Sequence, residues 1–145
     1  MVDDLRYKRL ERAKASALNG DYKSAYSILD ALHRKYPEDI EVHRLYGNVL
    51  ELDAWACETT RPMDERLRSA RKHYAHILRT NKHEPMAIFD LAEHFANLNK
   101  VSVARRFFAA FLMRYGNESA LIDEVEHAQA WLEVHAIPAK VQPDS

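Results

Sequence analysis

The chain of 145 residues is poor in the residues that bend or cross-link a backbone. It has one cysteine, three glycines and five prolines. The single Cys57 excludes an internal disulfide framework and a thiolate-rich metal site. Because 47% of the residues are hydrophobic and few break helices, the composition favours long helices joined by few turns. The length predicts one domain, residues 1–137, with a hydrophobic core.

The chain also lacks an excess of either charge. Its 21 basic and 22 acidic side chains nearly cancel, so no global field attracts nucleic acid or anionic lipid. Residues 1–4 are acidic and lack the apolar run of a signal peptide, and no stretch approaches the ~20 apolar residues of a membrane span. We expect a cytoplasmic protein without membrane insertion.

Three segments repeat one spacing of small and apolar residues. In each, a small residue is followed four positions later by a large apolar one, and three positions later by another. The three sets are Ala25, Leu29 and Leu32; Ala70, Tyr74 and Ile77; and Ala104, Phe108 and Phe111. In the first and third segments a small residue, Ala13 or Ala92, also lies 12 positions earlier. Units this short cannot bury their own apolar faces, so the pattern predicts stacked helical hairpins that share a core.

This pattern resembles the tetratricopeptide repeat, a helix-turn-helix unit whose copies form a curved array. The resemblance covers about residues 6–117 and implies an all-α fold, a right-handed solenoid of antiparallel helix pairs. Repeat 1 would span about 4–37, repeat 2 about 39–83 and repeat 3 about 85–116. Pro37 closes the first unit, whereas Gly116 stands where the third would have proline. A capping helix at about 119–136 and a disordered tail at 138–145 complete the expected architecture.

Local signals place the helix boundaries. Asn19 and Gly20 stop a helix that begins near Asp4, and the next runs from residue 21 or 22 to Lys35. A third helix starts near residue 39, and its partner reaches residue 80 or 81. The third pair is expected at about 85–98 and 101–114.

The second repeat is longer than the others. Gly47 and Ala70 are 23 residues apart, and the surplus of 11 residues is about three helical turns. We expect both helices to lengthen, with a turn at 59–62, the second helix starting near Pro62, and an apolar tip holding Trp55, Cys57 and Met63. The alternative is a longer loop between ordinary helices. Trp55 and Met63 would form a second interaction surface, pairing in a homodimer or docking a partner.

No group of residues has the pattern of a catalytic or metal site. His73 and His76 share a helix face with His83 nearby, but no carboxylate at ligand spacing completes a zinc set, so we expect surface histidines. Asp90 and His94 are four residues apart and could pair as acid and base, but no nucleophile accompanies them. Cys57 has no basic neighbour in sequence and is interpreted as semi-buried filler. The sequence therefore predicts no enzyme, no metal, no cofactor and no small-molecule substrate.

Two basic clusters are open to two interpretations. The first helix carries Arg6, Lys8, Arg9, Arg12 and Lys14, and the fourth carries Arg66, Arg68, Arg71 and Lys72. Either cluster would suit nucleic acid or an acidic peptide. Because the chain is neutral and no aromatic residues interleave these charges, we favour solvated faces and no nucleic-acid partner.

The resemblance implies a peptide-binding groove. In the tetratricopeptide family, the first helix of each pair lines a concave surface that receives an extended peptide. The corresponding positions here are Tyr7, Leu10, Lys14, Ala17, Arg44, Asn48, Glu51, Phe89, Glu93 and Asn97. Asn48 stands where family members often place an asparagine that bonds the ligand backbone. Glu93 stands where a carboxylate-binding clamp would need positive charge, which disfavours such a clamp.

We therefore expect a protein-interaction module or adaptor that binds a peptide or helix of a protein partner through the groove and the second hairpin. Two alternatives remain: a small secretion-type chaperone that holds a client segment, and a self-assembling scaffold.

Overall fold

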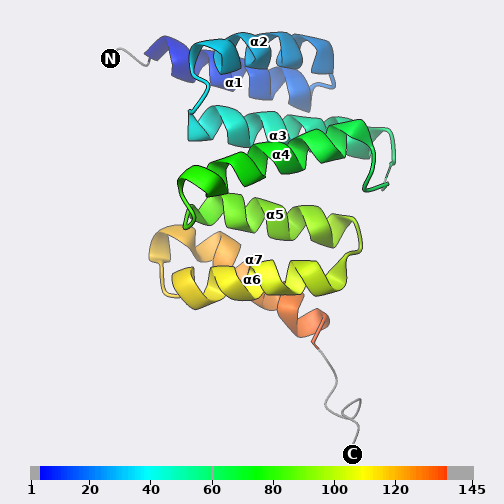
Figure 1. Cartoon of the computed structure of the whole chain (residues 1–145), viewed down its shortest axis with the longest axis vertical. Coiled ribbons are helices and arrows are strands. Elements are labelled where there is room, and N and C mark those ends of the chain that lie inside the picture. The colour runs from blue at the N-terminus through cyan, green and yellow to red at the C-terminus, as the bar shows by residue number, and fades with distance from the viewer. Residues whose placement is uncertain (1–3, 60, 137–145) are drawn as a thin grey trace, which may run out of the picture. The chain divides into compact units, whose positions relative to one another are not determined.

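The computed structural model describes residues 4–59 and 61–136, and that part of the chain is helical without a strand. Figure 1 shows the element order. The helices are α1 (Asp4–Leu18), α2 (Tyr22–Lys35), α3 (Ile40–Ala56), α4 (Glu65–Thr80), α5 (Pro85–Asn97), α6 (Val101–Tyr115) and α7 (Ile122–Val134), with a short 3-10 turn η1 (Ser119–Leu121) before α7. The expected tail, residues 138–145, lies outside the described residues.

The chain divides into two compact units, residues 1–87 and 88–145, with the boundary near the start of α5. The sequence predicted one domain. The first unit holds α1 to α4, and the second holds most of α5 together with α6 and α7. No helix in the described ranges combines the length and the apolar character needed to cross a bilayer.

Most predicted helix ends are confirmed because local caps set them. Asp21 caps α2 by accepting a hydrogen bond from the Ser24 amide, and Asp39 caps α3 by accepting one from Val42. Gly20, with φ of 82°, lies in the turn between α1 and α2, in the left-handed conformation that favours glycine. The observed starts and ends of α1, α2, α5 and α6 lie within one residue of those predicted.

In the first unit, α1 and α2 form one antiparallel hairpin and α3 and α4 form another (Figure 1). Helix α3 contacts α1, α2 and α4. Ala13, Ala25 and Leu29 pack with Val49 of α3, which joins the two hairpins through one core. All nine residues of the three repeated sets have no exposed surface, so the predicted burial is confirmed.

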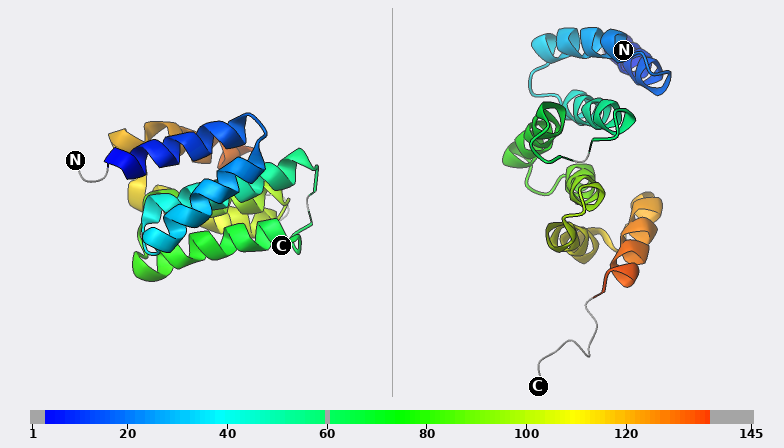
Figure 2. Two further views of the ribbon diagram at one scale, coloured as in Figure 1. Left: turned by 90° about the horizontal axis from the view of Figure 1, so that it is seen from above. Right: turned by 90° about the vertical axis from the view of Figure 1, so that its right-hand side faces the viewer.

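In the second unit, α7 lies along α6 (Figure 2). Phe108 of α6 is fully buried, and its ring lies 5.9 Å from Phe89 of α5 and 4.9 Å from Trp131 of α7 between ring centroids. One aromatic cluster therefore joins all three helices of this unit.

The second hairpin only partly follows the prediction of extended helices. Helix α3 continues for nine residues after Gly47, whereas α1 continues for five after Ala13. Helix α4 begins five residues before Ala70, at Glu65 rather than near Pro62, whereas α2 begins three residues before Ala25. The helices thus take up six of the 11 surplus residues, and the connection 57–64 takes up the other five. The prediction that the helices absorb the whole surplus is wrong, because capping by Asp64 starts α4 late.

Candidate peptide-binding site

A pocket of about 230 Å³ lies between α1 and α3 of the first unit. Its lining residues are Tyr7, Leu10, Glu11, Lys14, Glu41, Arg44, Leu45 and Asn48. Five of them, Tyr7, Leu10, Lys14, Arg44 and Asn48, are among the positions that the sequence predicted for a groove. The structure therefore brings these five together. Glu11, Glu41 and Leu45 were missed, although Glu11 lies one turn from Tyr7 on the same helix.

The pocket combines an apolar floor with charges of both signs. Leu10 is only 7% exposed and belongs to the core, whereas Tyr7 is 57% exposed at the rim. Ala17, also expected in the groove, is buried in the core instead. Lys14 and Arg44 supply cations, and the two glutamates supply carboxylates. The pocket can thus offer hydrogen-bond donors and acceptors beside apolar surface.

A hydrogen bond within the second hairpin holds the side chain of Asn48 in position. Its side-chain amide donates a 2.6 Å hydrogen bond to the Tyr74 hydroxyl, which donates one of 2.6 Å to the Glu51 carboxylate. Tyr74 is fully buried on α4, and Gly47 makes room for its ring. The Asn48 Oδ1 atom has no partner within the described ranges and is the acceptor that remains on this side chain. Glu51 thus positions the amide and is not a lining residue of the pocket.

The three predicted groove residues of α5 belong to the second unit. Phe89 is 9% exposed and packs on Phe108, Phe111 and His127, so it offers little surface for the peptide contact that the sequence predicted. Glu93 forms an ion pair with His127 of α7. Asn97 is exposed near the end of α5. His127 of α7 thus contacts two of the three α5 residues that the sequence assigned to the peptide.

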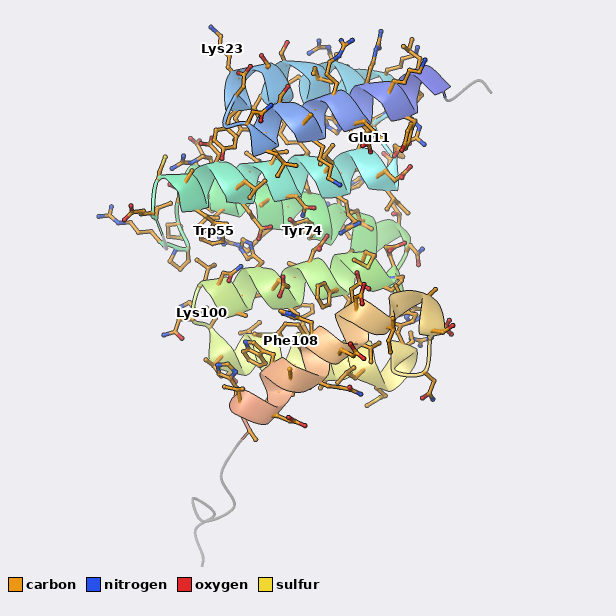
Figure 3. All side chains as sticks on the ribbon, turned by 180° about the vertical axis from the view of Figure 1, so that it is seen from behind. Glu11, Lys23, Trp55, Tyr74, Lys100 and Phe108 are labelled. Carbon is orange, nitrogen blue, oxygen red and sulfur yellow. The ribbon has the colours of Figure 1, made fainter. Side chains whose placement is uncertain are left out.

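The predicted second interaction surface is smaller than expected. Met63 is 71% exposed, but Trp55 at the end of α3 is half-buried (Figure 3). Arg66 closes the connection: its guanidinium lies 3.3 Å from Asp53 Oδ1, 3.1 Å from Asp64 Oδ2 and 3.3 Å from Cys57 Sγ. Asp53 also accepts a 2.7 Å hydrogen bond from the hydroxyl of Tyr26 on α2. Hydrogen bonds and ion pairs therefore hold the tip in place.

Two expectations about Cys57 are wrong. The thiol is exposed rather than semi-buried, and Arg66 is the basic partner that the sequence did not indicate. The two residues are nine positions apart, and only the path of the 57–64 connection brings them into contact. Arg66 and Arg71, whose guanidinium donates to the Pro62 carbonyl at 2.6 Å, hold this connection and are not a solvated basic face.

The expectation of surface histidines is wrong for two of the three residues named. His73 and His76 are half-buried and lie in a cluster with His33 of α2 and His43 of α3, whereas His83 is exposed. Within residues 4–59 and 61–136, no group of three histidine, cysteine or acidic side chains is placed to hold a metal ion. Asp90 and His94 of α5 are both buried.

No model of a known protein family matches the chain. No curated protein matches it significantly. The fold and the pocket therefore carry the functional argument.

Proposed function

We propose that the protein is an interaction module that binds an extended peptide segment of a protein partner in the pocket between α1 and α3. The observation that carries the proposal is the convergence of Tyr7, Lys14, Arg44 and Asn48 on this single pocket. An extended peptide presents alternating N–H and C=O groups, which need donors and acceptors beside apolar contact.

The lining residues favour binding over catalysis. They include no serine, threonine, cysteine or histidine, so the pocket lacks a hydroxyl or thiol nucleophile activated by an imidazole base. Its donors are the cations of Lys14 and Arg44 and the second amide hydrogen of Asn48, and its acceptors are Glu11, Glu41 and Oδ1 of Asn48. We assign no substrate, metal or cofactor to this pocket.

The proposed site is smaller than the groove that the sequence predicted, because it leaves out α5. Because α7 covers Phe89 and pairs with Glu93, the peptide is assigned to α1 and α3 alone. The other two readings, a client-holding chaperone and a self-assembling scaffold, are not favoured by a specific contact. Met63 is the main exposed apolar residue of the tip and is too little surface to drive self-assembly.

Selection from a display library of random linear peptides tests the proposal. Enriched peptides should bind the wild-type protein, and Arg44→Ala and Lys14→Ala should each weaken that binding several-fold in calorimetry. Lys23→Ala is the matched control, because Lys23 is an exposed cation on α2 outside the pocket (Figure 3). The proposal fails if no peptide is enriched, or if the pocket variants bind enriched peptides as tightly as the control does.

A further inference from the structure

Four histidines meet where α2, α3 and α4 pack in the first unit. The ring centroid of His33 lies 5.1 Å from that of His43 and 5.8 Å from that of His73. The rings of His43 and His73 are 5.1 Å apart, and those of His43 and His76 are 4.3 Å apart. Half of the eight histidines in the chain therefore lie in one contact cluster. It is separate from the residues that line the α1/α3 pocket.

Hydrogen bonds fix the proton positions in this cluster. His43 Nε2 lies 2.7 Å from the Pro37 carbonyl oxygen, which can only accept, so this nitrogen carries a proton. In neutral His43 the Nδ1 atom is then an acceptor, and it lies 2.9 Å from Nδ1 of His73. His73 must therefore donate from Nδ1. The bond between the two rings contains one proton.

A further proton on this pair is disfavoured at either ring. On Nδ1 of His43 it would place two N–H groups face to face across 2.9 Å and break the bond, and on His73 it would place a positive ring against the rings of His33 and His43. His33 is a further obstacle to protonation of the cluster, because its Nδ1 atom is buried and has no hydrogen-bond partner among the described residues. Tyr46 stacks on His73 at 4.6 Å and closes the cluster on that side.

Few negative groups face the cluster. The titratable groups that face His73 are His33 from α2, His43 and Tyr46 from α3, and His76 from α4 itself. Glu38, in the turn before α3, bonds His76 Nε2 at 2.8 Å and also faces His43. Asp30 is engaged by the Tyr46 hydroxyl. One carboxylate thus serves four imidazoles, which is too little negative charge to hold them all protonated.

We propose that His33, His43, His73 and His76 form an acid-sensitive latch, which holds α4 against α2 and α3 while the His43–His73 pair is neutral and loosens when that pair takes up a further proton. The inference does not depend on the peptide-binding proposal.

The direction of the pH effect follows from burial. Desolvation, followed by the nearby His43, His33 and His76, lowers the pKa of His73 from 6.5 to about 4, and desolvation also lowers the pKa of His43. Between these values the unfolded chain binds more protons than the folded chain. Stability is therefore complete above about pH 6.5 and falls as the pH falls toward 4.

The test is urea unfolding of the full chain between pH 8 and pH 5, with EDTA present so that no bound metal contributes. A Trp131→Phe background leaves Trp55 of the first unit as the fluorescent reporter. The unfolding constant should rise on the order of thirtyfold over this range. His73→Gln should flatten most of that rise, even if it lowers stability at every pH. His83→Gln, an exposed histidine beyond α4, should keep it.

Proton NMR of the wild-type rings supplies a second readout in case His73→Gln does not fold. Titration of His73 below pH 5, accompanied by faster amide exchange in α4, is the expected result. The latch is refuted if His73→Gln retains the wild-type pH dependence, or if the ring of His73 titrates near 6.5 while α4 stays protected.

Discussion

Asn48 of α3 donates a 2.6 Å hydrogen bond to the hydroxyl of Tyr74, a fully buried residue of α4. A residue assigned to partner binding is thus held by the core of the same hairpin. Its orientation is set before any peptide arrives, which lowers the entropic cost of binding.

We predict that Tyr74→Phe keeps the fold but frees the Asn48 amide. Removing the hydroxyl deletes the bonds to Asn48 and Glu51 and leaves these partners half-buried, so the free energy of unfolding should fall by about 1–3 kcal/mol. Urea denaturation measures this change. Peptide affinity should also fall, because Asn48 loses its support. An unchanged affinity would mean that the bond has no part in recognition.

Gly47→Ala should destabilise the second hairpin. A Cβ atom at this position would lie 2.5 Å from Cε1 of Tyr74, and overpacking of this kind costs about 1–3 kcal/mol. The penalty should shrink when Tyr74→Leu removes the ring. A double-mutant cycle measures the coupling, and additive effects of the two changes would contradict the assigned contact.

Ala104→Leu should destabilise the second unit by about 1–3 kcal/mol, because Ala104 is fully buried in α6. Ala109→Leu is the matched control, since Ala109 is exposed on the same helix. Thermal unfolding followed by Trp131 fluorescence, in a Trp55→Phe background, compares the two. Equal effects would show that Ala104 does not lie at a tight helix contact.

Arg66→Gln should open the connection 57–64. The change removes the guanidinium that bonds Asp53, Asp64 and Cys57, so a glutamate-specific protease should cut after Glu58 faster than in the wild type. Arg68→Gln is the control, because Arg68 is exposed on the same helix. Equal cleavage rates after Glu58 in both variants would contradict the closing role of Arg66.

The sequence predicted the helices well because their signals are local. Asp21, Asp39 and Gly20 act within one turn, and the repeated four-and-three spacing marks the buried face of each second helix. Five lining residues of the pocket between α1 and α3 were expected from the resemblance to the tetratricopeptide repeat, which assigns one face of each first helix to a groove.

The sequence could not show features that depend on contacts between distant helices. Phe89 carries no local sign that α7 will cover it, and the apolar face of α7 was interpreted only as a cap. The histidine cluster draws on three helices, so the spacing of His73 and His76 alone indicated a surface. Cys57 and Arg66 meet only through the path of the connection between α3 and α4.

The affinity of a library-selected peptide for Asn48→Ala and Asn97→Ala, measured by calorimetry, tests the central claim most directly. Asn48 lines the α1/α3 pocket, whereas Asn97 is an exposed asparagine of α5 in the other unit. Loss of a bond to the peptide backbone costs about 1–3 kcal/mol, so Asn48→Ala should bind roughly tenfold to hundredfold more weakly, and Asn97→Ala should bind like the wild type. Wild-type affinity in Asn48→Ala, or an equal loss in both variants, would contradict peptide binding at this pocket.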